Sequence, residues 1–110
     1  MKKFLVIYHA PAKAMASTAN HTPEEQAKGM APWLAWKAQH EDNIVDFGAP
    51  LMGGQNVSAE SDWASSDKEV SGYSIVKSTD ADTVKSMFQG HPHLAWAPGT
   101  SIEVHECVPM

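Results

Sequence analysis

The N-terminal run KKFLVIYH constrains the fold of this chain more than any other feature. β-Branched and aromatic residues fill the run, and its length is that of one strand. Side chains alternate between the two faces of a strand, so Phe4, Val6 and Tyr8 would point one way, and Leu5 and Ile7 the other. Both sets are apolar. A strand of this kind must be covered on both faces, which predicts a sheet with a protein layer on each side.

A helix is predicted to start at Thr22, because the sequence Thr-Pro-Glu-Glu combines three start signals. Thr22 can cap the helix, Pro23 suits the first helical position, and Glu25 completes a capping box. Apolar residues then recur at helical spacing, and we expect the helix to end between residues 40 and 43. Pro32 removes a backbone donor within this pattern, which predicts a kink or a break between two helical pieces.

The remaining segments complete an alternating order of strands and helices. Strands are predicted at residues 44–51, 70–77 and 102–108, a second helix between Asp80 and Gly90, and loops at 10–21, 58–68 and 91–99. The order strand, helix, strand, strand, helix, strand is typical of the ferredoxin-like α+β fold, a four-stranded antiparallel sheet with two helices on one face. We expect a single domain that spans residues 1–110.

Two helices can cover one face of such a sheet and leave the other face open. The first and third predicted strands carry apolar side chains on both faces, so a second protein layer is needed there. A second copy of the sheet is the simplest cover, which predicts a symmetric homodimer.

Composition excludes several classes of protein. Thirteen Asp and Glu against eight Lys and Arg give a net charge of −5 without a basic stripe, so nucleic acid is not an expected partner. No apolar run approaches the roughly 20 residues that span a bilayer, and we expect no membrane association. Cys107 is the single cysteine and cannot form an internal disulfide, which fits a reducing cytoplasm. Because dinucleotide and haem motifs are absent, we expect no cofactor.

Six segments in order resemble the YCII-related family of small dimeric α/β-barrel proteins, which includes the DGPF-domain branch. They are KFLVIY near the N-terminus, MAPWLAW (30–36), IVDFGAPL (44–51), KEVSGYSIVK (68–77), GHPHL (90–94) and IEVHE (102–106). Together they cover nearly the whole chain outside two long loops. The resemblance implies the ferredoxin-like fold, a YCII-like domain over the whole chain and a dimeric α/β barrel.

The resemblance carries over poorly to the residues that do chemistry. Typical members have a His on the first helix and an Asp before Pro in the loop after the second helix, proposed as an acid/base dyad. The helix position falls here at Met30 or Ala31, which cannot transfer a proton, and the Asp-Pro position corresponds to His91-Pro92. The Asp-Gly-Pro-Phe motif is also absent, with Ser-Asp-Trp-Ala (61–64) in that region.

The segment His91-Pro92-His93 is the sharpest candidate site. Proline disfavours the helical region for the preceding residue, and residues two apart in an extended segment point to similar sides. The two imidazoles could therefore converge on a substrate. They could instead brace a loop by bonding backbone carbonyls. We expect no metal, because zinc or iron needs three or four ligands. The possible additional ligands His9, Asp46, Glu103 and His105 have no diagnostic spacing.

Asp46 is the second candidate, because a carboxylate is costly in the middle of a strand unless it is paired. Strict alternation would place it on one face with Ile44 and Gly48, where it could act as a base or raise the basicity of a histidine. A solvated edge, or a hydrogen bond at a dimer interface, is the alternative.

Aromatic residues could form a pocket around this site. Trp33 and Trp36 are neighbours on the first helix, and Trp96 and Tyr8 could complete the wall of a pocket for a planar or apolar small molecule. Packing of the helix on the sheet would account for the same residues without a ligand.

These features leave two hypotheses about function. One is a cofactor-free enzyme that uses His91, His93 and Asp46 for elimination, isomerisation or hydrolysis of a small compound, either aromatic or not. It requires His91 and Asp46 to lie within hydrogen-bond reach, and it fails in this form if they occupy opposite faces of the sheet. The other is a non-catalytic accessory dimer that binds a small molecule and has lost the dyad.

Overall fold

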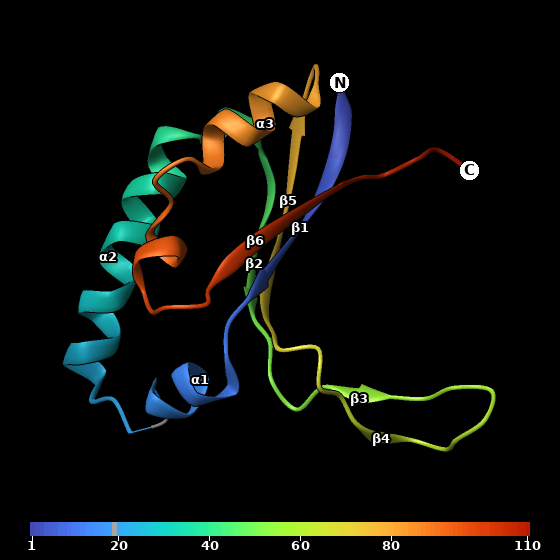
Figure 1. Cartoon of the computed structure of the whole chain (residues 1–110). Helices are drawn as coiled ribbons and strands as arrows, with labels where there is room; N and C mark the ends of the chain where they lie inside the picture. Colours follow the sequence, from blue (N-terminus) through green and yellow to red (C-terminus); the bar gives the residue numbers. More distant parts are fainter. Residues whose placement is uncertain (19) are drawn as a thin grey trace.

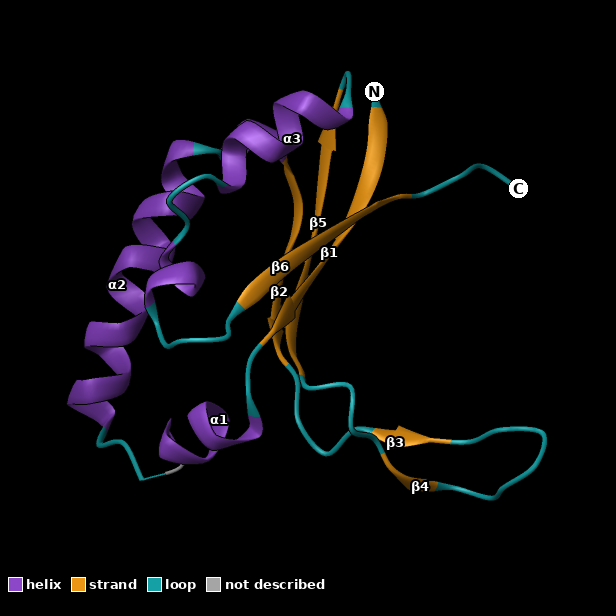
Figure 2. Ribbon diagram, in the orientation of Figure 1, coloured by secondary structure: helices purple, strands orange, loops and turns teal. Residues whose placement is uncertain are grey.

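The computed structural model of the chain describes residues 1–18 and 20–110 (Figures 1 and 2). Its elements, in chain order, are β1 (Lys2–His9), α1 (Ala12–Thr18), α2 (Pro23–Gln39), the 3₁₀ turn η1 (Glu41–Asn43), β2 (Ile44–Pro50), β3 (Gln55–Asn56), β4 (Ala64–Ser65), β5 (Val70–Ser78), α3 (Ala81–Phe88), the 3₁₀ turn η2 (Pro92–Ala95) and β6 (Ser101–Glu106). Among the described residues, no helix has both the length and the apolar character needed to cross a bilayer.

The main sheet has four strands in the order β2-β5-β1-β6, and every neighbouring pair is antiparallel. The helices α2 and α3 lie on one side of it (Figure 2). We name this side the closed face and the other the open face. This arrangement confirms the predicted ferredoxin-like α+β fold.

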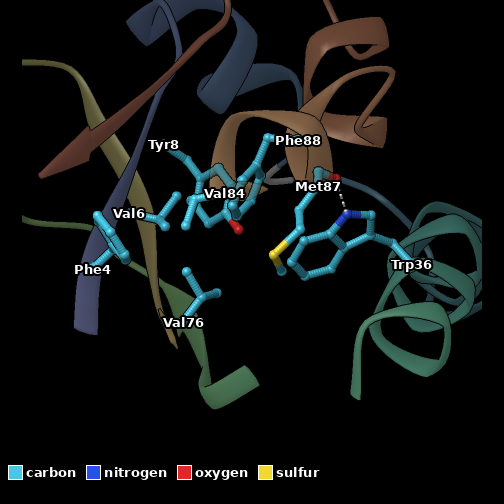
Figure 3. Packing of buried hydrophobic residues seen from close by; sticks show 8 residues of the cluster. All are labelled: Phe4, Val6, Tyr8, Trp36, Val76, Val84, Met87 and Phe88. Atoms are coloured by element: carbon cyan, nitrogen blue, oxygen red, sulfur yellow. Dashed lines mark hydrogen bonds between the residues drawn. The ribbon is translucent and has the colours of Figure 1, made fainter. Parts of the chain in front are cut away.

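The hydrophobic core lies between the closed face and the two helices. Its buried residues come from β1, β5, α2 and α3: Phe4, Val6, Tyr8, Val76, Trp36, Val84, Met87 and Phe88 (Figure 3). The indole Nε1–H of Trp36 donates a hydrogen bond to the Met87 carbonyl oxygen at 2.8 Å, which joins α2 to α3. The hydrogen bond gives the buried indole N–H, the one polar group of this side chain, an acceptor.

The predicted helix starts are confirmed. Thr22 accepts from the Glu25 amide, and the Glu25 carboxylate accepts from the Thr22 amide, so the capping box is complete. Asp80 caps α3 by accepting from the Thr83 amide at 2.8 Å. These hydrogen bonds satisfy amides that the first turn of a helix leaves free.

Two predictions about helices were wrong, the loop at 10–21 and the break at Pro32, whereas a kink at Pro32 stays a prediction. The helix α1 occupies most of the predicted loop 10–21, of which residue 19 lies outside the described residues, and the Pro11 carbonyl accepts from Ala14 and Met15 at its start. The helix α1 has only seven residues, so its sequence is too short to show apolar residues at helical spacing. In addition, α2 runs through Pro32 as one helix. Pro32 and Lys28, whose carbonyl loses its usual donor, are both exposed, so water can bond that carbonyl.

Residues 51–69 form a hairpin, which we name the arm, that leaves the sheet between β2 and β5 (Figure 1). The sequence predicts a loop there, over residues 58–68. The chain instead pairs Gln55 with Ser65 and Asn56 with Ala64, so β3 and β4 form a separate two-stranded sheet. Short pairing of this kind gives little periodicity in a sequence.

Candidate functional site

The chain geometry after α3 places His91 against the closed face. Gly90 has φ +69°, a conformation that favours glycine, and it turns the chain sharply after the helix. His91 is extended, with φ −60° and ψ 142°, as expected for a residue before proline, and Pro92 then starts η2. The prediction of an extended conformation is therefore confirmed for His91, whereas the chain is helical from Pro92 to Ala95.

His91 lies inside a shell of aromatic rings and is only 1% exposed. Its ring centroid lies 4.5 Å from Trp33, 4.7 Å from Trp36, 5.4 Å from Phe88 and 5.5 Å from Tyr8. Three of these four residues were predicted as pocket aromatics. Phe88 was not, although the turn at Gly90 folds the residues on its two sides together.

The hydrogen bonds of His91 fix its tautomer and leave one atom without a partner. Its Nδ1 accepts from the His93 amide at 3.0 Å, so Nδ1 carries no proton and a neutral ring carries its proton on Nε2. Among the described residues nothing accepts from this buried Nε2. Burial lowers the pKa of His91 to about 4, with smaller contributions from His93 and His40. The imidazole is therefore neutral at pH 7.

His93 is placed differently, although it is also buried. Its Nε2 lies 2.8 Å from the carbonyl oxygen of His9, and its ring contacts Tyr8 edge-on at 5.2 Å. Burial lowers the pKa of His93, whereas hydrogen bonds to the backbone of His9 and Ser101 oppose the shift. These contacts favour the bracing alternative for His93, because its polar atoms tie η2 to the sheet.

Asp46 lies on the open face, away from His91. It pairs with Ile75, whereas Ile44 pairs with Val76, and the strand shifts register between the two pairs. Because of this irregularity, Ile44 packs against the core and Asp46 points to the opposite side of the sheet. The prediction that Ile44 and Asp46 share one face was therefore wrong. The Asp46 carboxylate accepts from the Gly48 amide and from the Tyr73 hydroxyl at 3.3 Å.

The four predicted pocket aromatics do not share one environment. Tyr8, Trp33 and Trp36 contact the His91 ring, but Trp96 contacts His93 at 5.8 Å and is 38% exposed. The Tyr8 hydroxyl donates to Ser74, which itself donates to the Phe47 carbonyl. Burial raises the pKa of Tyr8 to about 12, so this hydroxyl stays protonated.

A groove of about 360 Å³ opens beside the aromatic shell. The Trp36 side chain and the two residues that flank His91, Gly90 and Pro92, line it together with Pro32, Ala35, Gln39, His40, Ser86, Met87 and Gln89. No Asp, Glu, Lys or Arg in the described part of the chain lines this groove. Its size falls at the lower end of the range for small-molecule pockets. His40, which lines this groove, is not among the site residues predicted from the sequence.

The open face carries polar groups of a different kind. The Glu103 carboxylate accepts from His9 Nε2 at 2.7 Å and from His105, and these hydrogen bonds lower the pKa of Glu103. Within residues 1–18 and 20–110, no group of three or more His, Cys, Asp or Glu is arranged to hold a metal ion. His9, Glu103 and His105 form a hydrogen-bonded network on this face.

Comparison with known proteins supports the fold. No protein-family model and no curated protein matches the chain. Among solved structures, it is similar to 5-chloro-2-hydroxyhydroquinone dehydrochlorinase from Burkholderia phenoliruptrix AC1100, in complex with 2,5-dihydroxybenzoquinone. The two are 16% identical, the TM-score is 0.52, and the match covers 94% of this chain and 91% of that chain. At this identity the likeness shows a shared fold.

Proposed function

We propose that this chain is a cofactor-free small-molecule enzyme in which His91 donates a hydrogen bond to an oxygen of the substrate. The observation that carries the proposal is the buried Nε2–H of His91 without an acceptor. A buried donor without a partner is costly, by about 1–3 kcal/mol, and such groups are rare in folded proteins. A carbonyl or phenolic oxygen at this atom would remove the cost.

The state of His91 favours a donor over a base. With its pKa lowered to about 4, the ring binds a proton poorly, but a neutral imidazole can still polarise a carbonyl through its N–H. Polarisation of this kind assists elimination or isomerisation next to a carbonyl. The version that pairs His91 with Asp46 in one protomer is abandoned, because the two residues lie on opposite faces of the sheet.

The groove beside Trp36 supports a small, planar and oxygen-rich ligand. An indole wall suits stacking, and the amides of Gln39 and Gln89 can bond hydroxyl or carbonyl groups. The ligand named for the similar solved structure, 2,5-dihydroxybenzoquinone, has this chemistry and serves as a probe. A movement of Trp36 or Pro92 would be needed for it to reach His91.

The test compares two replacements of His91 that differ in one hydrogen-bond donor. His91→Gln can keep an N–H near the Nε2 position, whereas His91→Phe removes it and keeps a planar ring. We expect 2,5-dihydroxybenzoquinone to shift the His91 Nε2–H resonance of the ¹⁵N-histidine-labelled protein. Binding should weaken at least tenfold in His91→Phe and less in His91→Gln. Replacing the exposed His21 by Gln should leave binding unchanged.

Turnover of 5-chloro-2-hydroxyhydroquinone by the same proteins separates catalysis from binding. Chloride release that disappears in His91→Phe supports the enzyme. Binding without turnover favours the second candidate, a non-catalytic accessory protein. Among residues 1–18 and 20–110, no carboxylate lines the groove beside His91, and Met30 or Ala31 stands at the helix position of the family's dyad. Both observations favour that candidate. If the probe neither binds nor shifts the His91 resonance, both versions of the site are wrong.

The homodimer is part of the proposal, and the accessible surface supports it. The chain exposes 7734 Å², whereas a compact monomer of its mass exposes about 5,900 Å². The excess of roughly 1,800 Å² exceeds the about 800 Å² that each partner buries in a standard interface. The radius of gyration, 15.2 Å, is likewise above the about 13 Å of a compact chain of this length.

Membership of the YCII-related family, as a single domain with the dimeric α/β-barrel arrangement, completes the proposal. The order of the six segments and the observed fold support it. A reducing cytoplasmic location is also proposed, on the basis of the single, exposed Cys107.

A further inference from the structure

The arm exposes large apolar side chains far from the core. Met52 is 93% exposed and Trp63 64% exposed, and every residue of the arm except the half-buried Ser66 is exposed. Hydrogen bonds between Ser58 and Ser61 hold the tip. An isolated two-stranded hairpin is marginally stable in water. The arm therefore has the properties of a surface that is completed by another protein.

The direction of the arm relates it to the open face. The helices lie on one side of the sheet, whereas the arm and the C-terminal residues extend on the other side (Figure 1). From its base to residue 60 the arm spans nine residues, or roughly 30 Å when extended. Stacked sheets lie about 10 Å apart, so the arm is long enough to reach a second copy packed on the open face and to lie along it.

The charges of the arm have a complement on the open face. The arm contains four carboxylates, Glu60, Asp62, Asp67 and Glu69, and one lysine, Lys68, for a formal charge of −3. Lys3 and Lys77 are paired across β1 and β5, and alternation puts both on the open face, at the end of the sheet away from the arm. Like charges opposite one another are unfavourable, and neither lysine forms an ion pair within the described residues.

We propose that in the homodimer the arm of each copy docks at the Lys3–Lys77 end of the other copy's open face. A twofold axis perpendicular to the strands brings the arm end of one sheet over the lysine end of its partner. The carboxylates of the arm tip then face Lys3 and Lys77, and the apolar side chains of the arm are buried by the second copy. This inference rests on the proposed homodimer and adds its orientation.

A charge exchange measured by sedimentation equilibrium tests this docking. The double variant Glu60→Lys and Asp62→Lys, and the double variant Lys3→Glu and Lys77→Glu, should each raise the dimer dissociation constant at least about tenfold. All four changes in one chain should restore it to within about threefold of wild type, because both ends then carry exchanged charges. The changes Glu24→Lys and Asp82→Lys, on the helices, provide a control for the arm variant, because they change the net charge by the same amount.

The outcomes separate the docking from the rest of the proposal. An arm variant that behaves like the helix control, or a combined variant without recovery, overturns the arm contact while a dimer is still present. A wild-type chain that stays monomeric at 100 µM overturns both the arm contact and the homodimer. The ligand test at His91 is independent of both results. Circular dichroism of each variant confirms that a loss of dimer is not a loss of fold.

Discussion

The two faces of the sheet use the same strands but place polar groups in opposite surroundings. On the closed face, Ser74, His91 and His93 are at most 2% exposed. On the open face of a single copy, Asp46 and Glu103 are exposed to water. A polar group on the closed face that loses its hydrogen-bond partner therefore cannot bond water instead, whereas water can replace a lost partner on the open face.

This difference explains which histidine is the better candidate for function. His9 and His105 on the open face both form hydrogen bonds with the exposed Glu103 carboxylate, so each already has a polar partner. His91 on the closed face has the opposite character, because it is neutral, rigidly oriented and short of one acceptor. Three predictions test the contrast between buried and exposed positions, and they begin with the largest expected effect.

Replacing Trp36 by Ala should lower the free energy of unfolding by about 3–5 kcal/mol. The indole is 6% exposed, packs against His91 and bonds the Met87 carbonyl. Leu34 on the same helix is 52% exposed, and Leu34→Ala should change stability by no more than about 0.5 kcal/mol. Urea unfolding followed by circular dichroism measures both. Similar losses for the two variants would show that α2 does not divide into a buried and an exposed side.

Acid should destabilise the protein through His91. The folded pKa is about 4 and the ordinary value 6.5, so between these pH values the unfolded chain binds a proton that the folded chain does not. Stability should therefore be retained above pH 6.5 and should fall by about 3 kcal/mol as the pH approaches 4.

The His91→Phe variant isolates this contribution. His93, Glu25, Asp80 and Glu103 also have lowered pKa values and favour the folded state at higher pH, and all four remain in the variant, so wild type and variant share their effect. Urea unfolding at pH 7, 5.5 and 4 should show a shallower loss for the variant. Parallel losses in the two proteins would mean that His91 takes up its proton in the folded state as easily as in the unfolded chain.

The sequence predicts the fold better than it predicts the site, for a physical reason. Period-two alternation in the N-terminal strand and the capping box at Thr22 are local signals, and both are confirmed. The position of Asp46 depends on a strand irregularity that pairing with β5 sets, and no local pattern in β2 reveals it. The pairing of His91 Nδ1 with the His93 amide is local in sequence, but its consequence depends on burial by rings from β1 and α2 that are distant in the sequence.

The smallest effect compares the same chemical change on the two faces. Tyr8→Phe removes the hydroxyl that donates to Ser74 in the core, and it should cost about 1 kcal/mol, because the Ser74 oxygen loses a donor that water cannot replace. Tyr73→Phe removes the hydroxyl that donates to the exposed Asp46 at 3.3 Å, and its urea midpoint should stay at the wild-type value. If Tyr73→Phe instead weakens the dimer in sedimentation equilibrium while the unfolding midpoint of the monomer stays constant, this hydrogen bond lies inside the contact between copies. An equal loss of monomer stability in both variants would contradict the distinction between a dry and a solvated face.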